Sequence, residues 1–230
     1  MNSNETTLND LTLDKLKFIL SSDGTYYSVA AKDTSISGEV VIPSNYNGLP
    51  VKEISNRAFE CCTLLENVII PDSVTTIGRD AFYYCPSLTN IDIPNSVTTI
   101  CAGAFFNCLL LTRIVIPNGV TEISYDTFAY CLSLKSIVIP DSVTSIAHCA
   151  FYECSALTSI VIPNSVTSIG YSAFKNCSSL TNIVIPDSVK TIRYDAFANC
   201  SSLTSVIIKG MPAIEETVFE NCTNLNIVYC

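Results

Sequence analysis

The sequence has 230 residues, and 48% of them are hydrophobic, which is enough for a substantial core and argues against disorder outside the first few residues. Its formal net charge of −9 leaves little basic surface for phosphate groups, so we expect binding neither to nucleic acid nor to an anionic membrane surface. No apolar run reaches the roughly 18–20 residues that span a bilayer, so no membrane insertion is expected.

Residues 1–36 are predicted to form an N-terminal capping segment. The first ten residues, MNSNETTLND, have neither a basic region nor an apolar stretch, so they do not resemble a secretory signal peptide. Residues 17–30 are predicted to form a β-hairpin around Asp23-Gly24, a dipeptide that favours tight turns. We expect this hairpin to cover the first coil of the region that follows.

Residues 37–230 repeat with a period of 23 residues, which indicates a solenoid. Proline, phenylalanine, cysteine and leucine each recur in phase with this period. The proline column is Pro71, Pro94, Pro117, Pro140, Pro163 and Pro186; the phenylalanine column is Phe82, Phe105, Phe128, Phe151, Phe174 and Phe197. The cysteine column runs from Cys62 to Cys200 and the leucine column from Leu65 to Leu203.

Each unit is predicted to make one turn of a coil. In the unit that starts at Leu157, the pattern L-x-x-I-x-I predicts a short strand, and the proline that follows predicts a turn. A second short extended segment follows, and the spacing of Ala173, Phe174 and Cys177 suits a turn of α- or 3₁₀-helix. Stacked units bury their apolar columns with neighbours ~4.8 Å apart. We therefore predict a leucine-rich-repeat solenoid of about eight coils, with stacked parallel strands and short α or 3₁₀ turns on the opposite face.

The last coil departs from the pattern. Lys209 replaces the column proline, and one residue is lost before Phe219. Terminal repeats normally carry a polar cap, and the strand predicted at residues 225–230 has none. We expect this coil to be covered by further chain or by a partner, and end-to-end self-association through it is one way to cover it.

The unit I-V-I-P-[DN]-S-V-T-S-I-x-x-x-A-F-x-x-C-x-x-L-T-S closely resembles the BspA-like leucine-rich repeats, over roughly residues 17–230. The resemblance implies a curved solenoid from a surface or secreted protein of a bacterium or protozoan parasite, used for adhesion to host proteins or other microbes. It transfers no catalytic residue. Because no signal peptide or anchor is visible, a cytoplasmic location stays open beside the extracellular or cell-surface one.

The column cysteines are predicted to be buried thiols. Stacked side chains point in parallel, whereas a disulfide needs Cβ atoms ~3.5–4.5 Å apart and turned toward each other. The spacings of the close cysteine pairs do not suit zinc, so no metal site is expected. Four cysteines lie off the column and their redox state is left open, Cys230 being the candidate for intermolecular oxidation: Cys61, Cys101, Cys149 and Cys230.

No catalytic site is expected. The single histidine, His148, lies in a column of tyrosines, where a surface ring is its natural role. No glycine loop that could bind a phosphate is present, and the Asp/Asn column after the prolines lacks the calcium-binding pattern, so no cofactor is predicted.

Two candidate binding faces remain. The residue between the two isoleucines of each strand points away from the core, and this strand-face column reads Ile69, Asp92, Val115, Val138, Val161, Val184, Ile207 and Tyr229. Arg113, in the neighbouring column, and Asp92 are predicted to contribute specificity. Valine and isoleucine also suit strands for their own sake. The second face is an aromatic file, which could instead fill gaps between coils: Tyr125, His148, Tyr171 and Tyr194.

From these observations we predict a non-enzymatic module that binds a protein or a glycan, in cell-surface adhesion or in the interaction of host and microbe. A structural spacer and an intracellular scaffold are the alternatives.

Overall fold

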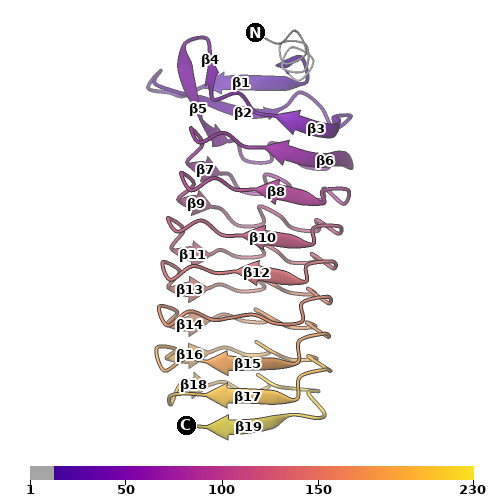
Figure 1. Cartoon of the computed structure of the whole chain (residues 1–230), viewed down its shortest axis with the longest axis vertical. Helices are drawn as coiled ribbons and strands as arrows, with labels where there is room; N and C mark the ends of the chain where they lie inside the picture. The colour runs from indigo at the N-terminus through magenta and orange to yellow at the C-terminus, as the bar shows by residue number, and fades with distance from the viewer. Residues whose placement is uncertain (1–12) are drawn as a thin grey trace.

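A computed structural model describes residues 13–230 of the chain, so the expectation about the first ten residues lies outside the described part. The coils stack along one axis, with β1 (Leu16–Leu20) and β2 (Tyr27–Ala31) at one end and β19 (Asn226–Tyr229) at the other (Figure 1). Each regular coil contributes two short strands, which form two parallel columns along the solenoid. The predicted leucine-rich-repeat solenoid is confirmed.

The first column holds the longer strands, in which the L-x-x-I-x-I pattern places alternate apolar side chains inward. It comprises β3 (Ser37–Val41), β6 (Leu64–Ile69), β8 (Asn90–Asp92), β10 (Arg113–Val115), β12 (Ser136–Val138), β15 (Asn182–Ile185), β17 (Ser205–Ile208) and β19 (Asn226–Tyr229). Hydrogen bonds group these strands into three separate sheets, β3-β6-β8, β10-β12 and β15-β17-β19.

The second column holds mostly two-residue strands that follow the proline turn of each coil. It comprises β5 (Leu49–Ile54), β7 (Thr76–Ile77), β9 (Thr99–Ile100), β11 (Glu122–Ile123), β13 (Ser145–Ile146), β14 (Ser168–Ile169), β16 (Thr191–Ile192) and β18 (Ala213–Ile214). Within residues 13–230 this column is broken once, between β9 and β11.

The predicted N-terminal hairpin is present. Strands β1 (Leu16–Leu20) and β2 (Tyr27–Ala31) pair antiparallel, and the Asp23 carboxylate accepts hydrogen bonds from Ser21 and Thr25 in the turn. Strand β2 also pairs in parallel with β5, so it takes the first place of the second column. The solenoid therefore has about nine turns and not the predicted eight. The division into residues 1–36 and 37–230 stays a prediction.

The first regular coil is five residues longer than the others, and this extension contains strand β4 (Asn45–Tyr46), which pairs antiparallel with β5. The turn between them has Asn47 and Gly48 at positive φ, as this pair of residues favours. Tyr46 stacks on Phe18 of the hairpin, with ring centroids 3.9 Å apart. The extension thus ties the hairpin to the first coil.

The predicted α or 3₁₀ turns on the opposite face are wrong, because no helix forms there. An α-helix needs each N–H to bond four residues back along its own chain. Here alternate N–H groups point along the solenoid axis: Phe82 donates to the Ala104 carbonyl and Tyr84 to the Phe106 carbonyl, both at 2.8 Å. Each coil reaches this geometry with two residues at positive φ, such as Asp80 (55°) and Tyr84 (56°).

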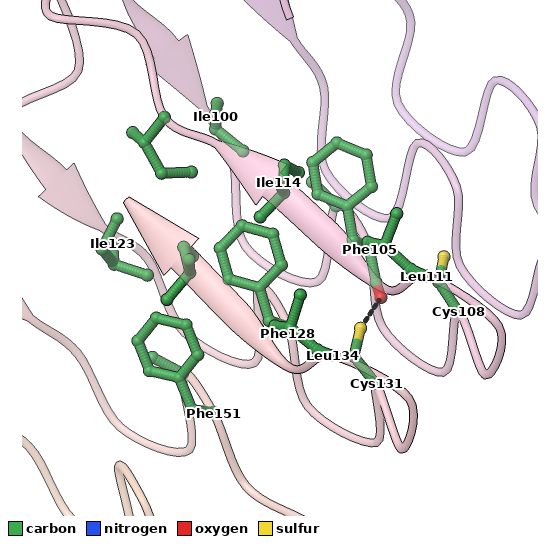
Figure 2. Close-up of a cluster of buried hydrophobic side chains, with 14 of the residues drawn as sticks. Ile100, Phe105, Cys108, Leu111, Ile114, Ile123, Phe128, Cys131, Leu134 and Phe151 are labelled. Carbon is green, nitrogen blue, oxygen red and sulfur yellow. Dashed lines mark hydrogen bonds between the residues drawn. The ribbon is translucent and has the colours of Figure 1, made fainter. Parts of the chain in front are cut away.

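The core matches the predicted apolar columns. The phenylalanines from Phe59 to Phe197 are fully buried and stack with centroids 5.1–5.6 Å apart and ring planes within 12° of parallel. Figure 2 shows three of these rings above one another, with the isoleucine and leucine columns beside them. Since no single coil encloses these side chains, the stack itself makes the core.

The column cysteines are buried free thiols, as predicted, but they also form hydrogen bonds. The Cys131 thiol donates to the Phe105 carbonyl on the preceding coil at 3.2 Å (Figure 2). For the column cysteines from Cys85 to Cys200, the distances from the thiol sulfur to the phenylalanine carbonyl oxygen lie between 3.0 and 3.3 Å. Burial raises the pKa of Cys131 to about 12. The column therefore stays protonated at neutral pH.

Candidate binding faces

The strand-face column lies on the outside of the first strand column. Val161 is 78% exposed and Val138 is 58% exposed, while Ile69, Val115 and Val184 are also exposed. Parallel pairing aligns its members directly, for example Val115 with Val138 and Val184 with Ile207. Ile207 is half-buried and Asp92 is exposed. The arrangement is an outward apolar strip along the solenoid.

Tyr229 was assigned to this column, and the register corrects that assignment. Val228 is the residue opposite Ile207, whereas Tyr229 lies opposite the core residue Ile208. The cause is a second lost residue in the last coil, where Leu225-Asn-Ile227 replaces the Leu-Thr-Ser-Val spacing that ends at Val206. Tyr229 is 64% exposed because no further coil covers it in the described chain.

The two residues predicted to give specificity lie at a break in this face. Asp92 ends β8 and Arg113 begins β10, and these two strands are not hydrogen-bonded to each other. Both side chains are exposed. A second interruption lies at residues 158–162, which form no regular strand and carry the most exposed valine of the strip.

The aromatic file is a continuous row of touching rings. Tyr125 and His148 meet edge to face with centroids 5.1 Å apart, His148 and Tyr171 do so at 4.5 Å, and Tyr171 stacks on Tyr194 at 5.8 Å. Tyr125 is 55% and Tyr194 43% exposed, while His148 and Tyr171 are half-buried. Arg193 lies over the Tyr171 ring at 5.8 Å.

A second aromatic row runs beside it on the turn face. Tyr83 stacks on Phe106 at 4.8 Å, and tilted contacts of 5.3 Å continue through Tyr130 to Tyr152. Rings that cover one another in this way leave only their edges and polar tips to solvent. Tyr125 is the ring of the first file with the largest exposed fraction.

The surface around Tyr125 is hollowed, which sequence reasoning missed. Three neighbouring hollows, of about 340, 250 and 400 Å³, all have Tyr125 in their lining. Acidic groups accompany it: Glu122 lines the first two, and Asp80 and Asp126 line the third. Reduced solvent around its carboxyl group and the charge of Asp80 raise the pKa of Asp126.

A ladder of amide side chains was also missed. Asn176 donates to Glu153 at 2.7 Å, Asn199 to Asn176 at 2.8 Å, and Asn221 to Asn199 at 2.7 Å. All four residues have positive φ, a conformation that asparagine tolerates well. The recurrence of asparagine one residue before the column cysteine was the signal that could have revealed it.

His148 and Cys149 are the remaining candidates for reactive groups. His148 is held between two tyrosine rings, and burial raises the pKa of its neighbour Cys149, which disfavours a reactive thiolate. Within residues 13–230, no three His, Cys, Asp or Glu side chains are placed to hold a metal ion. In the same range, no helix is long and apolar enough to cross a bilayer.

Comparison with known proteins agrees with this geometry. The family model described as BspA type leucine-rich repeat region matches six copies over residues 32–158 and 144–230. A T. pallidum leucine-rich repeat protein is 30% identical, with a TM-score of 0.76 over 83% of this chain and 88% of that chain. A leucine-rich cell surface protein of Faecalibacterium prausnitzii is 24% identical, with a TM-score of 0.51 over 94% and 93%. A leucine-rich repeat protein of Bacteroides ovatus is 25% identical, with a TM-score of 0.50 over 94% and 70%. No curated protein matches the sequence significantly.

Proposed function

The chain belongs to the BspA-type leucine-rich repeat family, and from this membership we propose that it is a non-enzymatic module that binds a protein or glycan partner at a cell surface. Adhesion, or contact between host and microbe, is the role that the family resemblance suggests. The structural neighbour from Faecalibacterium prausnitzii, which is described as a cell surface protein, supports this location.

The exposed apolar strip of the strand face carries the proposal. Val161 is 78% exposed and lies outside any regular strand, so strand preference does not account for it, and contiguous exposed apolar area marks interaction sites. The strip runs through β6, β10, β12, β15 and β17 and is flanked by short polar side chains such as Asn90, Ser136 and Asn182. An apolar centre with a polar rim is the usual anatomy of a protein interface.

The experiment compares the wild type with a Val138→Thr/Val161→Thr variant for binding to purified extracellular matrix proteins and to a glycan array. Threonine keeps the β-branched shape and removes apolar surface, so the fold is expected to be unchanged while affinity falls about tenfold or more. The control is Thr144→Val/Thr167→Val, at the residues before β13 and β14, which removes two hydroxyl hydrogen bonds between coils but leaves the strand face intact. Binding that survives changes both to the strip and to the aromatic file would contradict the proposal.

A further inference from the structure

One junction between coils differs from all the others. Along the second column, the residue after each isoleucine donates its N–H to the isoleucine carbonyl of the preceding coil. Such bonds join Cys101 to Ile77 at 2.9 Å and Ala147 to Ile123 at 2.9 Å, and they continue at both ends of the solenoid. Among the described residues the series is interrupted once, where Ser124 makes no bond to Ile100.

The first strand column is open at the same junction. Strand β8 does not pair with β10, just as β9 does not pair with β11. Only the turn face joins the two coils regularly, through bonds such as Gly103 to Tyr125 at 2.8 Å and Phe105 to Thr127 at 2.9 Å. Backbone hydrogen bonds therefore join these two coils on the turn face, whereas the bonds between strands are missing in both strand columns.

Three residues of the coil that follows the junction depart from the repeat pattern. Gly119 replaces a column serine, whose hydroxyl donates across coils at positions 96, 142 and 165, as Ser96 does to Val74 at 2.7 Å. Glu122 replaces a threonine or serine, and Thr127 replaces a column alanine. Thr127 is buried, and its hydroxyl donates to the Ser124 carbonyl at 2.7 Å. At Gly119 the two coils approach so closely that a Cβ would lie 2.9 Å from Thr98 Cγ2, and the turn is filled by the buried Thr127 in place of an alanine.

The opening forms the hollow of about 340 Å³, which lies within the size range of small-ligand pockets. Residues 98–102 line one wall, and Val120, Thr121, Glu122, Ser124 and Tyr125 line the other. The Thr98 and Ile100 carbonyls and the Thr121 and Ser124 N–H groups face this junction without the partners that their equivalents have in other coils. Backbone groups without partners are strong sites for a polar ligand.

The side chains define the ligand further. The Ser124 hydroxyl donates to the Glu122 carboxylate at 2.9 Å, which places an acceptor in the hollow. The Tyr125 ring is 55% exposed and forms an apolar wall. Among the described residues, Glu122 is the one charged residue that lines this hollow, whereas Asp80 of the adjoining hollow is paired with Arg79 at 3.5 Å, so an anionic ligand is disfavoured next to Glu122. Strands β9 and β11, on the two sides of the junction, have only two residues each. A peptide strand inserted between them would form few backbone hydrogen bonds, so a peptide ligand is disfavoured.

We propose that this junction is a binding site for a neutral carbohydrate, whose hydroxyl groups bond to the free backbone groups and Glu122 while its apolar face stacks on Tyr125. The ring supplies contact area, and the paired donors and acceptors supply orientation, as expected of a small-ligand site. The proposal rests on the binding function above and names a ligand class for a site away from the strand face.

The test titrates the chain with maltotriose, cellotriose, chitotriose, mannotriose and lactose, using saturation-transfer NMR and calorimetry. At least one saccharide is expected to bind saturably. Tyr125→Ala is expected to weaken it tenfold or more, Tyr125→Phe to retain it, and Tyr194→Ala, in the same file but outside the three hollows, to leave it unchanged. The triple variant Gly119→Ser/Glu122→Thr/Thr127→Ala restores the column residues and is expected to lose binding, since it removes the Glu122 acceptor and places a Cβ within 2.9 Å of Thr98 Cγ2 at the edge of the hollow.

The site assignment is overturned if no saccharide binds, or if the triple variant and Tyr125→Ala bind as the wild type does. It is also overturned if pentalysine binds in a Tyr125-dependent manner and the saccharides do not, since that outcome assigns the hollow to a cationic peptide. Loss of saccharide binding in Val138→Thr/Val161→Thr alone places the site on the strand face. Failure of all saccharides with intact strand-face binding leaves the proposed function standing and removes only this site.

Discussion

The column cysteines combine two roles within single residues. Each fills core volume, and each satisfies a phenylalanine carbonyl of the preceding coil, as Cys131 does for Phe105. A buried thiol in these surroundings resists ionisation, because the thiolate would lose its solvation. The same burial that stabilises the coil therefore makes it sensitive to alkaline pH.

Cys131→Ser tests this sensitivity. Burial raises the pKa of Cys131 from 9.0 to about 12, so the folded state holds the proton more tightly than the unfolded chain does. The stabilising contribution of the thiol is complete below pH 9 and is lost as the pH rises toward 12. Serine can donate to the same carbonyl and does not titrate in this range. Urea unfolding at pH 8 and 11 should show the advantage of the wild type shrinking by on the order of 1–2 kcal/mol. An advantage that is constant with pH would contradict the prediction.

Tyr84 shows the backbone strain that the turn opposite the strands imposes on a single residue. It has φ 56° and is 43% exposed, while the same column carries asparagine at positions 107, 176 and 199. A bulky residue is strained in this conformation and asparagine is tolerated. Tyr84→Asn is expected to raise the free energy of unfolding by about 0.5–1 kcal/mol, measured by urea denaturation.

The neighbouring Tyr83 is the matched control for this change. It has no positive φ and stacks on Phe106 at 4.8 Å, so Tyr83→Asn removes a contact without relieving strain. This variant should lower stability. Equal effects of the two substitutions would show that loss of a tyrosine ring, and not backbone strain, decides the outcome.

At the scale of elements, the period of the sequence predicted which side chains are buried but not how the backbone is bonded. Ala173, Phe174 and Cys177 have the spacing of a helical turn, yet their neighbours Ser172 and Asn176 have positive φ and no helix forms. The spacing of apolar residues indicates only which side chains face inward. A helical turn and the observed turn, whose N–H groups bond to the next coil, place the same side chains inward. The direction of the N–H groups is set by the neighbouring coil, which a single repeat does not reveal.

The amide ladder is an element that spans several coils, and Asn199 is its central member. It donates to Asn176 and accepts from Asn221, so Asn199→Gly keeps the positive φ accessible and removes both hydrogen bonds. We expect a loss of about 1–2 kcal/mol in urea unfolding. Asn107→Gly is the control, since Asn107 has the same conformation without a side-chain hydrogen bond among the described residues. A comparable loss in both variants would assign the effect to the backbone.

At the scale of the molecule, the candidate faces were predictable where they follow the repeat and were missed where they depart from it. The valine strip and the aromatic file were found because each is a column. Tyr229 was misplaced because the last coil loses a second residue, and the hollow at Tyr125 was missed because it depends on Gly119, Glu122 and Thr127 acting together.

The stability of a repeat protein is approximately a sum of nearest-neighbour terms, so one weak junction divides the chain into two blocks. The junction between Ile100 and Ser124 lacks the ladder bonds of both strand columns and keeps those of the turn face. Opening there should require less free energy than opening at the next junction, where Ala147 donates to Ile123 at 2.9 Å and Thr144 to Thr121 at 2.8 Å.

Native-state hydrogen exchange measures this difference directly. The amides of Thr121 and Ser124 lack partners across the junction, so they should exchange at least about tenfold faster than those of Thr144 and Ala147, which hold the equivalent places one coil later. The triple variant Gly119→Ser/Glu122→Thr/Thr127→Ala, which brings this coil back to the repeat pattern, should slow exchange at residues 121 and 124 toward the values of the later coil. Equal protection of the two pairs in the wild-type chain would show that the solenoid opens as one unit, and that the departures in this coil change its surface without weakening its junction.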